Sequence, residues 1–388
     1  MTGVSVVIPT VGRPSLRTLL SALSSALSPA ASASASTPGV SAAASSPAVP
    51  VSGSSPAVSV SGSSSGATVS ASSPAVSVEI IVVDDRTDQT RPLDLPADVD
   101  VKVLAGPGGG PAAARNIGWR AARHEWVAFL DDDVVPGDGW WEALADDLIA
   151  ADATTGGVQG NLDVPLPADR RPTDWERVTA GLADGAWLTA DMAYRRTALE
   201  RTGGFDERFP RAFREDAELA HRVREQGWTL HRGRRRVTHP VRPESTWVSL
   251  RTQLGNGDDA LLRRLYGPRW RELLAIPPGR RHRHALITAA GLGAAVSRLA
   301  GFRKTSLLLG AAWATGTAEF AAARILPGPR DPREVATMVA TSVAIPPLAI
   351  FHWLRGAVRS RTASRPSAIA GRGAAVRGAR SRSSEDSR

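Results

Sequence analysis

Two short apolar runs in this sequence end in consecutive aspartates, and this pattern limits the folds that the chain can adopt. The run EIIVV is followed by Asp84-Asp85, and the run WVAFL is followed by Asp131-Asp132-Asp133. Short runs rich in β-branched and aromatic residues are typical of buried strands. In a parallel sheet, the carboxyl ends of such strands meet at the edge where ligands bind. The aspartates therefore predict a polar site at that edge.

The surrounding sequence alternates between predicted strands and predicted helices. Strands are predicted at residues 4–8, 79–83, 99–104, 126–130, 157–162 and 187–194, and helices at residues 16–27, 112–122, 134–150, 197–202 and 215–226. Strands that alternate with helices need crossover connections, which favour parallel pairing. The sequence therefore predicts an α/β fold, in which a mostly parallel sheet is flanked by helices.

The segment 28–78 differs from the sequence on both sides of it. It contains only Ser, Ala, Pro, Val, Gly and Thr, and the pentapeptide SSPAV occurs in it three times. Without leucine, isoleucine, aromatic or charged residues, it cannot bury enough surface to offset the entropy of ordering. We predict a disordered insertion in a surface loop, so that residues 1–27 and 79–245 form one domain.

Residues 246–354 are predicted to be helical, and from about residue 285 they are rich in Ala, Leu and Gly. Residues 335–354 carry no formal charge and would span about 30 Å as a helix, the thickness of a bilayer core. Two interpretations remain open. The helices are buried against the α/β domain, or residues 305–354 associate with a membrane. In the second case they form a hairpin joined at residues 327–334, or they lie in the interface.

The net charge of +9 is concentrated near the C-terminus, where residues 355–388 contain nine arginines and two acidic residues. Such a segment predicts a disordered arginine-rich tail and not a folded nucleic-acid-binding surface. The chain has no cysteine, which excludes disulfides and thiolate metal sites. Its first residues show no basic segment followed by a long apolar run, so we expect no cleaved signal peptide.

Asp131 and Asp133 stand two residues apart at the end of a predicted strand. Their carboxylates can bind one Mg²⁺ or Mn²⁺ directly or through water, because these ions prefer oxygen ligands. A solvated acidic turn or a helix N-cap would use the same residues. His239 follows a short Val-Thr run, and it would be either a third metal ligand or a structural histidine.

Four other polar residues fall where they could hold a ligand at the same edge. Asp84 and Asp85 could accept hydrogen bonds from the N–H of a base or from a ribose hydroxyl. Arg115 and Asn116 lie near the start of a predicted helix, after a glycine-rich turn, and could reach a base or a phosphate. That turn lacks the Gly-Lys-Ser/Thr ending of a Walker A motif and the spacing of the dinucleotide-binding fingerprint.

Glu215 and Asp216 open a predicted helix. Acidic residues at a helix N-terminus are stabilised by about 0.3–1 kcal/mol, which is one explanation for the pair. The other explanation is a general base that removes a proton from a hydroxyl group. Successive helical residues point about 100° apart, so only one of the two faces a reacting group directly.

Taken together, six motifs resemble the family 2 glycosyltransferases of the GT-A fold. The motifs are SVVIPT at residues 5–10, IIVVDD at 80–85, AARNIG at 113–118, FLDDD at 129–133, GGFDERF at 203–209 and REDAELAHRV at 214–223. Each motif is ordinary by itself, whereas six in this order are specific. The likeness covers residues 4–239 without the insertion, and the chain after His239 is not covered.

The resemblance implies a GT-A-like domain that transfers a sugar from a nucleotide-diphosphate sugar to an acceptor hydroxyl, with inversion at the anomeric carbon. Asp131, Asp133 and His239 would bind Mg²⁺ or Mn²⁺, and Asp216 would be the catalytic base. The acceptor would be a glycan, a lipid or a cell-envelope precursor. Because the donor is cytosolic, we expect the protein in the cytoplasm or on the cytoplasmic face of the plasma membrane.

The remaining site residues are assigned to the donor and to the acceptor. Glu215 and Asp191 would support the acceptor or catalysis. The nucleotide sugar would be bound by Pro9, Thr10, Arg13, Asp84, Asp85, Arg115, Asn116 and Asp132.

Two other functions remain as alternatives. A sugar-nucleotide nucleotidyltransferase also combines a parallel sheet with an acidic metal site. Its first strand should be followed by a glycine-rich basic loop, which the sequence PTVGR at residues 9–13 matches poorly. A non-catalytic, membrane-anchored scaffold or nucleic-acid-binding protein would act through the arginine tail. That function would leave the acidic clusters unexplained.

Overall fold

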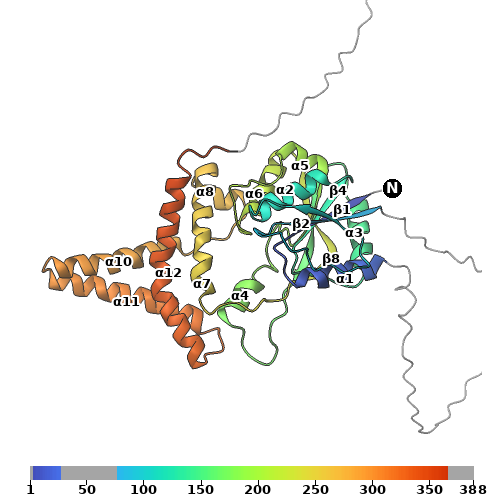
Figure 1. The fold of residues 1–388 in the computed structure, drawn as a ribbon. Coiled ribbons are helices and arrows are strands. Elements are labelled where there is room, and N and C mark those ends of the chain that lie inside the picture. The colour runs from blue at the N-terminus through green and yellow to red at the C-terminus, as the bar shows by residue number, and fades with distance from the viewer. Residues whose placement is uncertain (1–2, 28–76, 366–388) are drawn as a thin grey trace, which may run out of the picture.

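The computed structural model describes residues 3–27 and 77–365. The predicted insertion, except for its last two residues, and the part of the predicted tail after residue 365 therefore lie outside the described residues. The described chain forms an eight-stranded sheet with helices on both faces and a helical region beside it (Figure 1). The strands are β1 Val4–Thr10, β2 Val78–Asp84, β3 Lys102–Ala105, β4 Trp126–Leu130, β5 Val135–Pro136, β6 Thr155–Asp163, β7 Asp191–Arg195 and β8 Thr229–Thr238.

The helices divide into those that cover the sheet and those that form the C-terminal region. The first group is α1 Ser15–Leu27, α2 Pro111–Ala121, α3 Trp140–Ile149, α4 Asp174–Ala180, α5 Arg196–Thr202 and α6 Glu215–Glu225. The second group is α7 Val248–Arg251, the 3₁₀ helix η2 Thr252–Gly255, α8 Asn256–Tyr266, α9 Trp270–Leu273, α10 Arg281–Leu299, α11 Arg303–Ile325 and α12 Pro332–Arg359.

The strand order is β3-β2-β1-β4-β7-β6-β8-β5. β1 pairs in parallel with β2 and β4, β2 with β3, and β6 with β8, whereas the other three pairs are antiparallel. The register places Thr10 of β1 opposite Asp84 of β2, so both strands end at the same edge of the sheet. This arrangement confirms the predicted α/β sheet with flanking helices and a helical C-terminal region.

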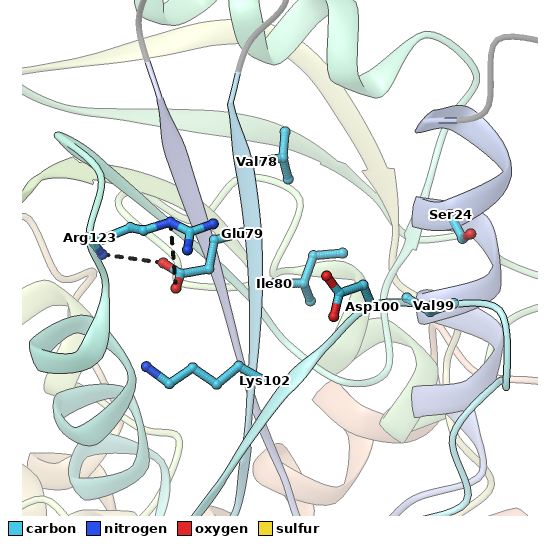
Figure 2. Close-up of a pocket in the computed structure, with 8 residues that line it drawn as sticks. All are labelled: Ser24, Val78, Glu79, Ile80, Val99, Asp100, Lys102 and Arg123. Atoms are coloured by element: carbon cyan, nitrogen blue, oxygen red, sulfur yellow. Dashed lines mark hydrogen bonds and ion pairs between the residues drawn. The ribbon is translucent and has the colours of Figure 1, made fainter.

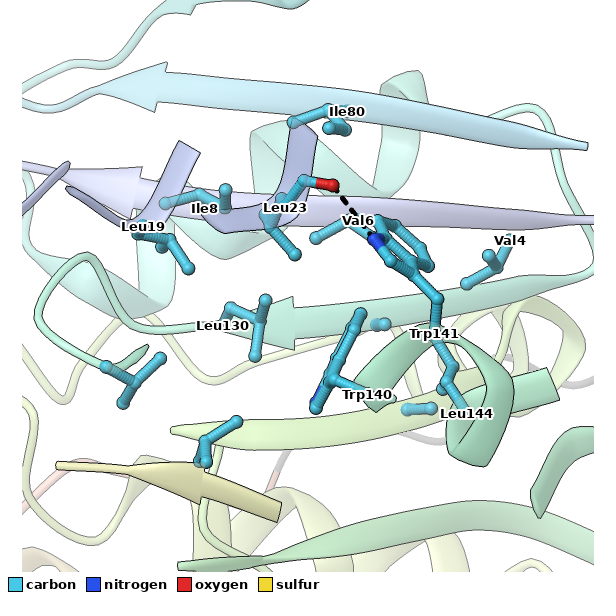
Figure 3. Packing of buried hydrophobic residues seen from close by; sticks show 14 of the residues in the cluster. Val4, Val6, Ile8, Leu19, Leu23, Ile80, Leu130, Trp140, Trp141 and Leu144 are labelled. Atoms are coloured by element: carbon cyan, nitrogen blue, oxygen red, sulfur yellow. Dashed lines mark hydrogen bonds between the residues drawn. The ribbon is translucent and has the colours of Figure 1, made fainter. Parts of the chain in front are cut away.

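Alternate residues of β1 point into two separate cores. Val6 and Ile8 pack in the core that includes residues of α1 and α3, whereas Val7 packs in the core that includes residues of α2, α5 and α6. In the first core, Trp141 of α3 donates its indole N–H to the carbonyl of Leu23 in α1 at 3.0 Å (Figure 3). Because side chains alternate along a strand, both cores fix the register of β1 and with it the position of its polar end.

Two predicted boundaries were wrong where the backbone takes a left-handed conformation. The strand predicted from residue 187 begins only at Asp191, because Trp187 has a φ of 66°, which a strand cannot contain. The helix predicted from residue 134 begins at Trp140, after the left-handed Gly139. The short strand β5 lies between the predicted start of this helix at residue 134 and its observed start at Trp140.

Helix α4 was not predicted, although the sequence contains its start signal. Thr173 accepts a hydrogen bond from the backbone N–H of Glu176, and the Glu176 carboxylate accepts one from the backbone N–H of Thr173. This reciprocal pair is a capping box, which the sequence Thr-x-x-Glu allows.

The C-terminal helices pack on one another through a buried polar network. Arg324 of α11 donates to the hydroxyls of Thr341 and Ser342 in α12 at 2.8 and 3.1 Å. Its guanidinium also pairs with Asp174 of α4 at 2.8 Å. Thr341 and Ser342 are fully buried, so these contacts tie α12 to the sheet domain.

Within the described residues, α12 is the helix that is long and apolar enough to cross a membrane, and 33% of its most apolar window is buried. α12 continues through Arg359, so residues 355–359 belong to a helix and not to the predicted tail. The predicted joint at residues 327–334 overlaps the linker between α11 and α12, and these two helices are in contact. A second, tighter connection that was not predicted joins α10 to α11 through residues 300–302.

Candidate active site

The loops after β1 and β4 are joined by a buried aspartate. The Thr10 hydroxyl donates to one oxygen of Asp132 at 2.6 Å, and the Arg13 guanidinium donates to the other oxygen at 2.5 Å. Asp132 is almost completely buried, and burial raises its pKa although the charge of Arg13 opposes this effect. Thr10, Arg13 and Asp132 therefore lie together as predicted, and Asp132 fixes the relative position of the two loops.

The two aspartates at the end of β2 have different surroundings. Asp84 accepts two hydrogen bonds from the Arg86 guanidinium, at 2.8 and 2.7 Å, and these bonds lower the pKa of Asp84. Asp85 accepts hydrogen bonds from the backbone N–H groups of residues 108, 109 and 110. Its carboxylate holds the glycine-rich turn before α2 in place.

Arg115 connects the end of β4 to the start of α6. One terminal nitrogen lies 2.9 Å from Glu215 Oε1, and the other lies 2.8 Å from Asp131 Oδ1. The side chain is only 1% exposed, and its guanidinium lies over the ring of Phe205. Burial alone would lower the pKa of Arg115, but the charges of Asp131 and Glu215 raise it above its ordinary value. Two acidic clusters 84 residues apart in the sequence thus converge on one cation.

Glu215 and Asp216 differ in exposure and in their contacts. Glu215 is 2% exposed, and its Oε2 has no hydrogen-bond partner. Burial, with a further contribution from the charge of Asp216, raises the pKa of Glu215 to about 8. Asp216 is only half-buried and accepts a hydrogen bond from the Ala217 backbone N–H at 2.7 Å. Burial also raises the pKa of Asp216.

Asp133 faces the segment that follows β8. Its Oδ1 lies 3.6 Å from His239 Nε2, and its Oδ2 lies 3.0 Å from Arg242 Nε. His239 Nδ1 is buried without a hydrogen-bond partner. Asp131, the other predicted ligand, points to Arg115 and keeps a side chain that is 28% exposed.

The predicted ligand set fits a divalent cation only in part. Within residues 3–27 and 77–365, no three His, Asp or Glu side chains are close enough to hold a metal ion together. Asp133 and His239 do supply an oxygen and a nitrogen donor at one place. Mg²⁺ is commonly held by one or two carboxylates together with substrate phosphates, so a complete protein cage is not required. The Asp133–His239 pair and the partly exposed Asp131 are therefore compatible with such an ion.

Residues 70–202 match the family model described as glycosyl transferase family 2. This part of the chain is similar to family 2 glycosyltransferases. Over 169 residues it is 32% identical to the pre-mycofactocin glycosyltransferase of Mycobacterium tuberculosis, in two strains, with 39% of this chain covered. The chain spans about a third of the length of these curated relatives (35%). This similarity favours a glycosyltransferase over a non-catalytic scaffold.

Two solved structures are similar to most of this chain. A mannosyltransferase from Pyrobaculum calidifontis, in complex with GDP-Man and Mn²⁺, has a TM-score of 0.49 at 20% identity, covering 90% of this chain and 86% of its own. Glucosyl-3-phosphoglycerate synthase from Mycobacterium tuberculosis, in complex with phosphoglyceric acid, has a TM-score of 0.39 at 13% identity, covering 72% of this chain and 82% of its own.

Asn116, which the sequence assigned to nucleotide binding, instead forms hydrogen bonds within the sheet domain. The Asn116 side chain donates to the carbonyl of Phe205 and to Glu207, and it accepts from the Phe205 backbone N–H and from Trp119. All its hydrogen-bonding positions are thus filled within the protein. The predicted contact of Asn116 with the nucleotide is therefore not supported by its surroundings.

Asp191 pairs with Leu130 at the end of β4, but its side chain lies in the core between β7, β6 and α3. It accepts hydrogen bonds from Arg235 at 2.7 Å and from the Trp140 indole at 3.0 Å, and it is 2% exposed. Burial raises its pKa, and Arg235 opposes that effect. Asp147 completes this network by pairing with Arg235. The first residue of β7 is thus a core residue, which excludes direct contact with an acceptor.

Three residues of the candidate site were missed from the sequence. Arg242 pairs with Asp133, and Arg214 stands directly before Glu215 with a left-handed φ of 80°. Asp259 of α8 holds Arg214 at 3.0 Å. A lone arginine in an arginine-rich chain gives no signal, and the contact with α8 joins segments 45 residues apart. The sheet domain thus contacts the C-terminal region at its acidic helix start.

A surface groove lies at the opposite end of the strands. It is lined by residues that include Ser24, Glu79, Lys102 and Arg123 (Figure 2). Glu79 stands near the start of β2, whereas Asp84 ends that strand, so the groove is about 15 Å or more from the acidic edge at the rise of a strand. We therefore place the candidate active site at the aspartate-rich edge.

Proposed function

We propose that this protein transfers a sugar from a nucleotide-diphosphate donor to an acceptor hydroxyl, with inversion at the anomeric carbon and with the help of a divalent cation. The observation that carries the proposal is the bridge from Asp131 through Arg115 to Glu215. It brings the strand-end aspartates and the acidic helix start to one site. Such a reaction needs both groups, because the leaving diphosphate and the attacking hydroxyl lie on opposite sides of the reacting carbon.

In this proposal, the donor lies along the ends of β1, β2 and β4. Pro9 and Thr10 end β1 beside Asp84, and Arg13 is partly exposed next to Asp132. The Asp84 carboxylate would accept hydrogen bonds from the nucleoside, and Arg13 would contact a phosphate. Asp85 and Arg115 would act by holding the loops that form this surface, because the Asp85 carboxylate and both terminal nitrogens of Arg115 are bonded within the protein.

Asp133 and His239 would hold a Mg²⁺ or Mn²⁺ ion, with Asp131 reaching it directly or through water. The ion would neutralise the charge that develops on the departing diphosphate. Arg242 lies against Asp133 and is partly exposed, so it is free to turn towards the phosphates when the carboxylate binds the cation.

Asp216 would remove the proton of the acceptor hydroxyl, and Glu215 would remain protonated beside it. Two adjacent carboxyl groups in a buried site do not both ionise easily, and their protons are shared between them. Glu215 is the more deeply buried of the two, and its unpartnered Oε2 would carry the proton. This leaves the charge on Asp216, which is the more exposed of the two.

The test is a screen of UDP-, GDP- and TDP-sugars that measures release of the nucleoside diphosphate. The acceptor panel would contain glycans, lipid-linked sugars and pre-mycofactocin. The last is included because the relatives from Mycobacterium tuberculosis are named pre-mycofactocin glycosyltransferases. The anomeric configuration of the product would be read by NMR. A retained configuration, or turnover that is unchanged in excess EDTA, would overturn the inverting or the metal-dependent part of the proposal. We place the reaction in the cytoplasm or on the cytoplasmic membrane face, where nucleotide sugars are supplied.

A further inference from the structure

The outer half of the α10–α11 hairpin packs only against itself within the described chain. The buried residues of α10 are His284 and Ile287, and those of α11 begin at Thr317. Every residue between 288 and 316 is exposed or half-buried. Figure 1 shows the hairpin extending away from α12 and from the sheet domain.

The exposed surface of this outer half is apolar. Its large exposed side chains are Leu292 (64%), Val296 (65%), Leu299 (89%), Phe302 (65%), Leu307 (74%) and Leu308 (74%). Leu292, Val296 and Leu299 follow one face of α10, because residues four and seven apart lie on the same side of a helix. None of them closes the hairpin. Its two helices instead meet through small residues, with Gly291 close to Trp313 and the Ser306 hydroxyl bonded to the Ala294 carbonyl at 2.9 Å.

The charges of the outer half of the hairpin all have one sign. Between Glu272 and Glu319 the sequence contains no acidic residue. Arg298, Arg303 and Lys304 surround the turn and are exposed. A second copy of the chain would bring the same cations against these, so the charge disfavours self-association through the tips. An anionic surface with an apolar layer beneath it complements both features.

We propose that the tip of the α10–α11 hairpin, residues 292–308, docks on the surface of an anionic lipid bilayer. The leucines and Phe302 enter the boundary between headgroups and acyl chains, and the three cations contact lipid phosphates. Interfacial helices of this kind are buried by about 5–10 Å, a depth that leaves the charged groups at the headgroups. This docking surface is distinct from α12 and goes beyond the proposed transfer activity.

The test is co-sedimentation of the full chain with vesicles of phosphatidylcholine that contain one third phosphatidylglycerol. The double variant Leu299→Asp/Phe302→Asp should weaken binding by tenfold or more, since it removes apolar contacts and adds repelling charges. The triple variant Arg298→Gln/Arg303→Gln/Lys304→Gln should weaken it by about a hundredfold at low salt, if each cation contributes as juxtamembrane basic residues do. All these variants keep the same C-terminal tail, so any contribution from it cancels.

The matched control is Ile149→Asp, an equally exposed apolar residue (58%) at the end of α3, which should bind vesicles like the wild type. Circular dichroism would show that the variants remain folded. Binding that survives in both tip variants would overturn the proposal and assign attachment to another segment. A concentration-dependent dimer that Leu299→Asp/Phe302→Asp dissociates, without vesicle binding by the wild type, would overturn it in favour of a self-interface. Because the readout is binding, failure of the proposed transfer activity would be seen separately.

Discussion

Arg115 Nη1 lies 2.9 Å from Glu215 Oε1, and neither side chain is more than 2% exposed. The two residues come from α2 and α6, which pack in the same core on one face of the sheet. A guanidinium enclosed in this way cannot be rehydrated when its partner is lost. The pair therefore joins the fold of the domain to the chemistry proposed for it.

Replacing Arg115 by methionine should destabilise the protein strongly. The variant removes the cation that Asp131 and Glu215 share, and breaking one side of a buried ion pair costs about 3–5 kcal/mol. Urea unfolding followed by circular dichroism would measure the change. Arg120→Met is the control, because Arg120 lies on the same helix but is half-exposed, and surface ion pairs contribute only about 0–1 kcal/mol. Equal effects of the two variants would contradict the importance of the bridge.

The stability of the protein should fall as the pH rises through the titration of Glu215. Its folded-state pKa is about 8, against an ordinary value of 4.5. The folded state thus binds the proton more tightly than the unfolded state. The stabilisation of the folded state by this protonated carboxyl is complete below about pH 4.5 and is lost as the pH rises through about 8.

Glu215→Gln fixes the uncharged form and should not show this loss. The free energy of unfolding of the wild type should therefore decrease relative to Glu215→Gln between these pH values, by on the order of a few kcal/mol. Parallel pH profiles of the two proteins would show that Glu215 titrates normally.

The sequence predicts the sheet and its polar edge well, because both depend on local patterns. The strand Trp126–Leu130 was predicted with its observed limits, and its apolar side chains need no knowledge of the rest of the fold. The convergence of Asp84 and Asp132 beside Thr10 follows from parallel pairing alone.

The partners of the site residues could not be predicted in the same way. Asn116 and Asp191 have the polar character of site residues, but their bonding is decided by segments 89 and 44 positions away. The left-handed Arg214 likewise depends on α8, a tertiary contact that no local pattern encodes. The sequence left the membrane association of the C-terminal helices open for a related reason. Whether an apolar helix is exposed depends on what packs against it, and local sequence does not show this.

Removing the carboxylate of Asp133 should abolish the metal-dependent part of turnover. Asp133→Asn should lower transfer by orders of magnitude, while thermal stability stays near that of the wild type because Arg242 is partly exposed and can be hydrated. Asp163→Asn, at an exposed aspartate that ends β6, is the control and should remain active. Turnover of the wild type in saturating EDTA would contradict the metal assignment.

Asp259 of α8 should affect catalysis through the position of Arg214. It accepts contacts from Arg214 at 3.0 Å and from Arg271 at 2.6 Å, and so fixes the residue directly before Glu215. Asp259→Asn should lower kcat by about 10–100-fold with little change in the KM of the donor, because displacement of a catalytic group by about 1 Å has effects of this size. Glu272→Gln, an exposed residue of α9, should change neither constant. A rise in the KM alone would contradict a positioning role.

The assignment of Asp216 as the base is tested most directly by comparing it with its neighbour. In an inverting displacement, the acceptor oxygen attacks from the side opposite the leaving diphosphate, so the base must lie across the donor from the metal aspartates. Asp216 is the second residue of α6, and the Arg115 guanidinium stands between the first residue, Glu215, and Asp131. It is also the more exposed of the two carboxyls, and it has no charged partner within ion-pair distance among the described residues.

Asp216→Asn should therefore retain donor and metal binding but lose about 10²–10⁴-fold in transfer, the usual contribution of a general base. Glu215→Gln should have a milder effect, since in the wild type this side chain is already protonated near neutral pH. Donor affinity would be measured by calorimetry and transfer by product formation at saturating donor. If Asp216→Asn transferred sugar at the wild-type rate while Glu215→Gln did not, the roles of the two residues would have to be exchanged. The ionised carboxylate would then be the buried one, which its single bond to Arg115 and its unpartnered Oε2 make energetically costly.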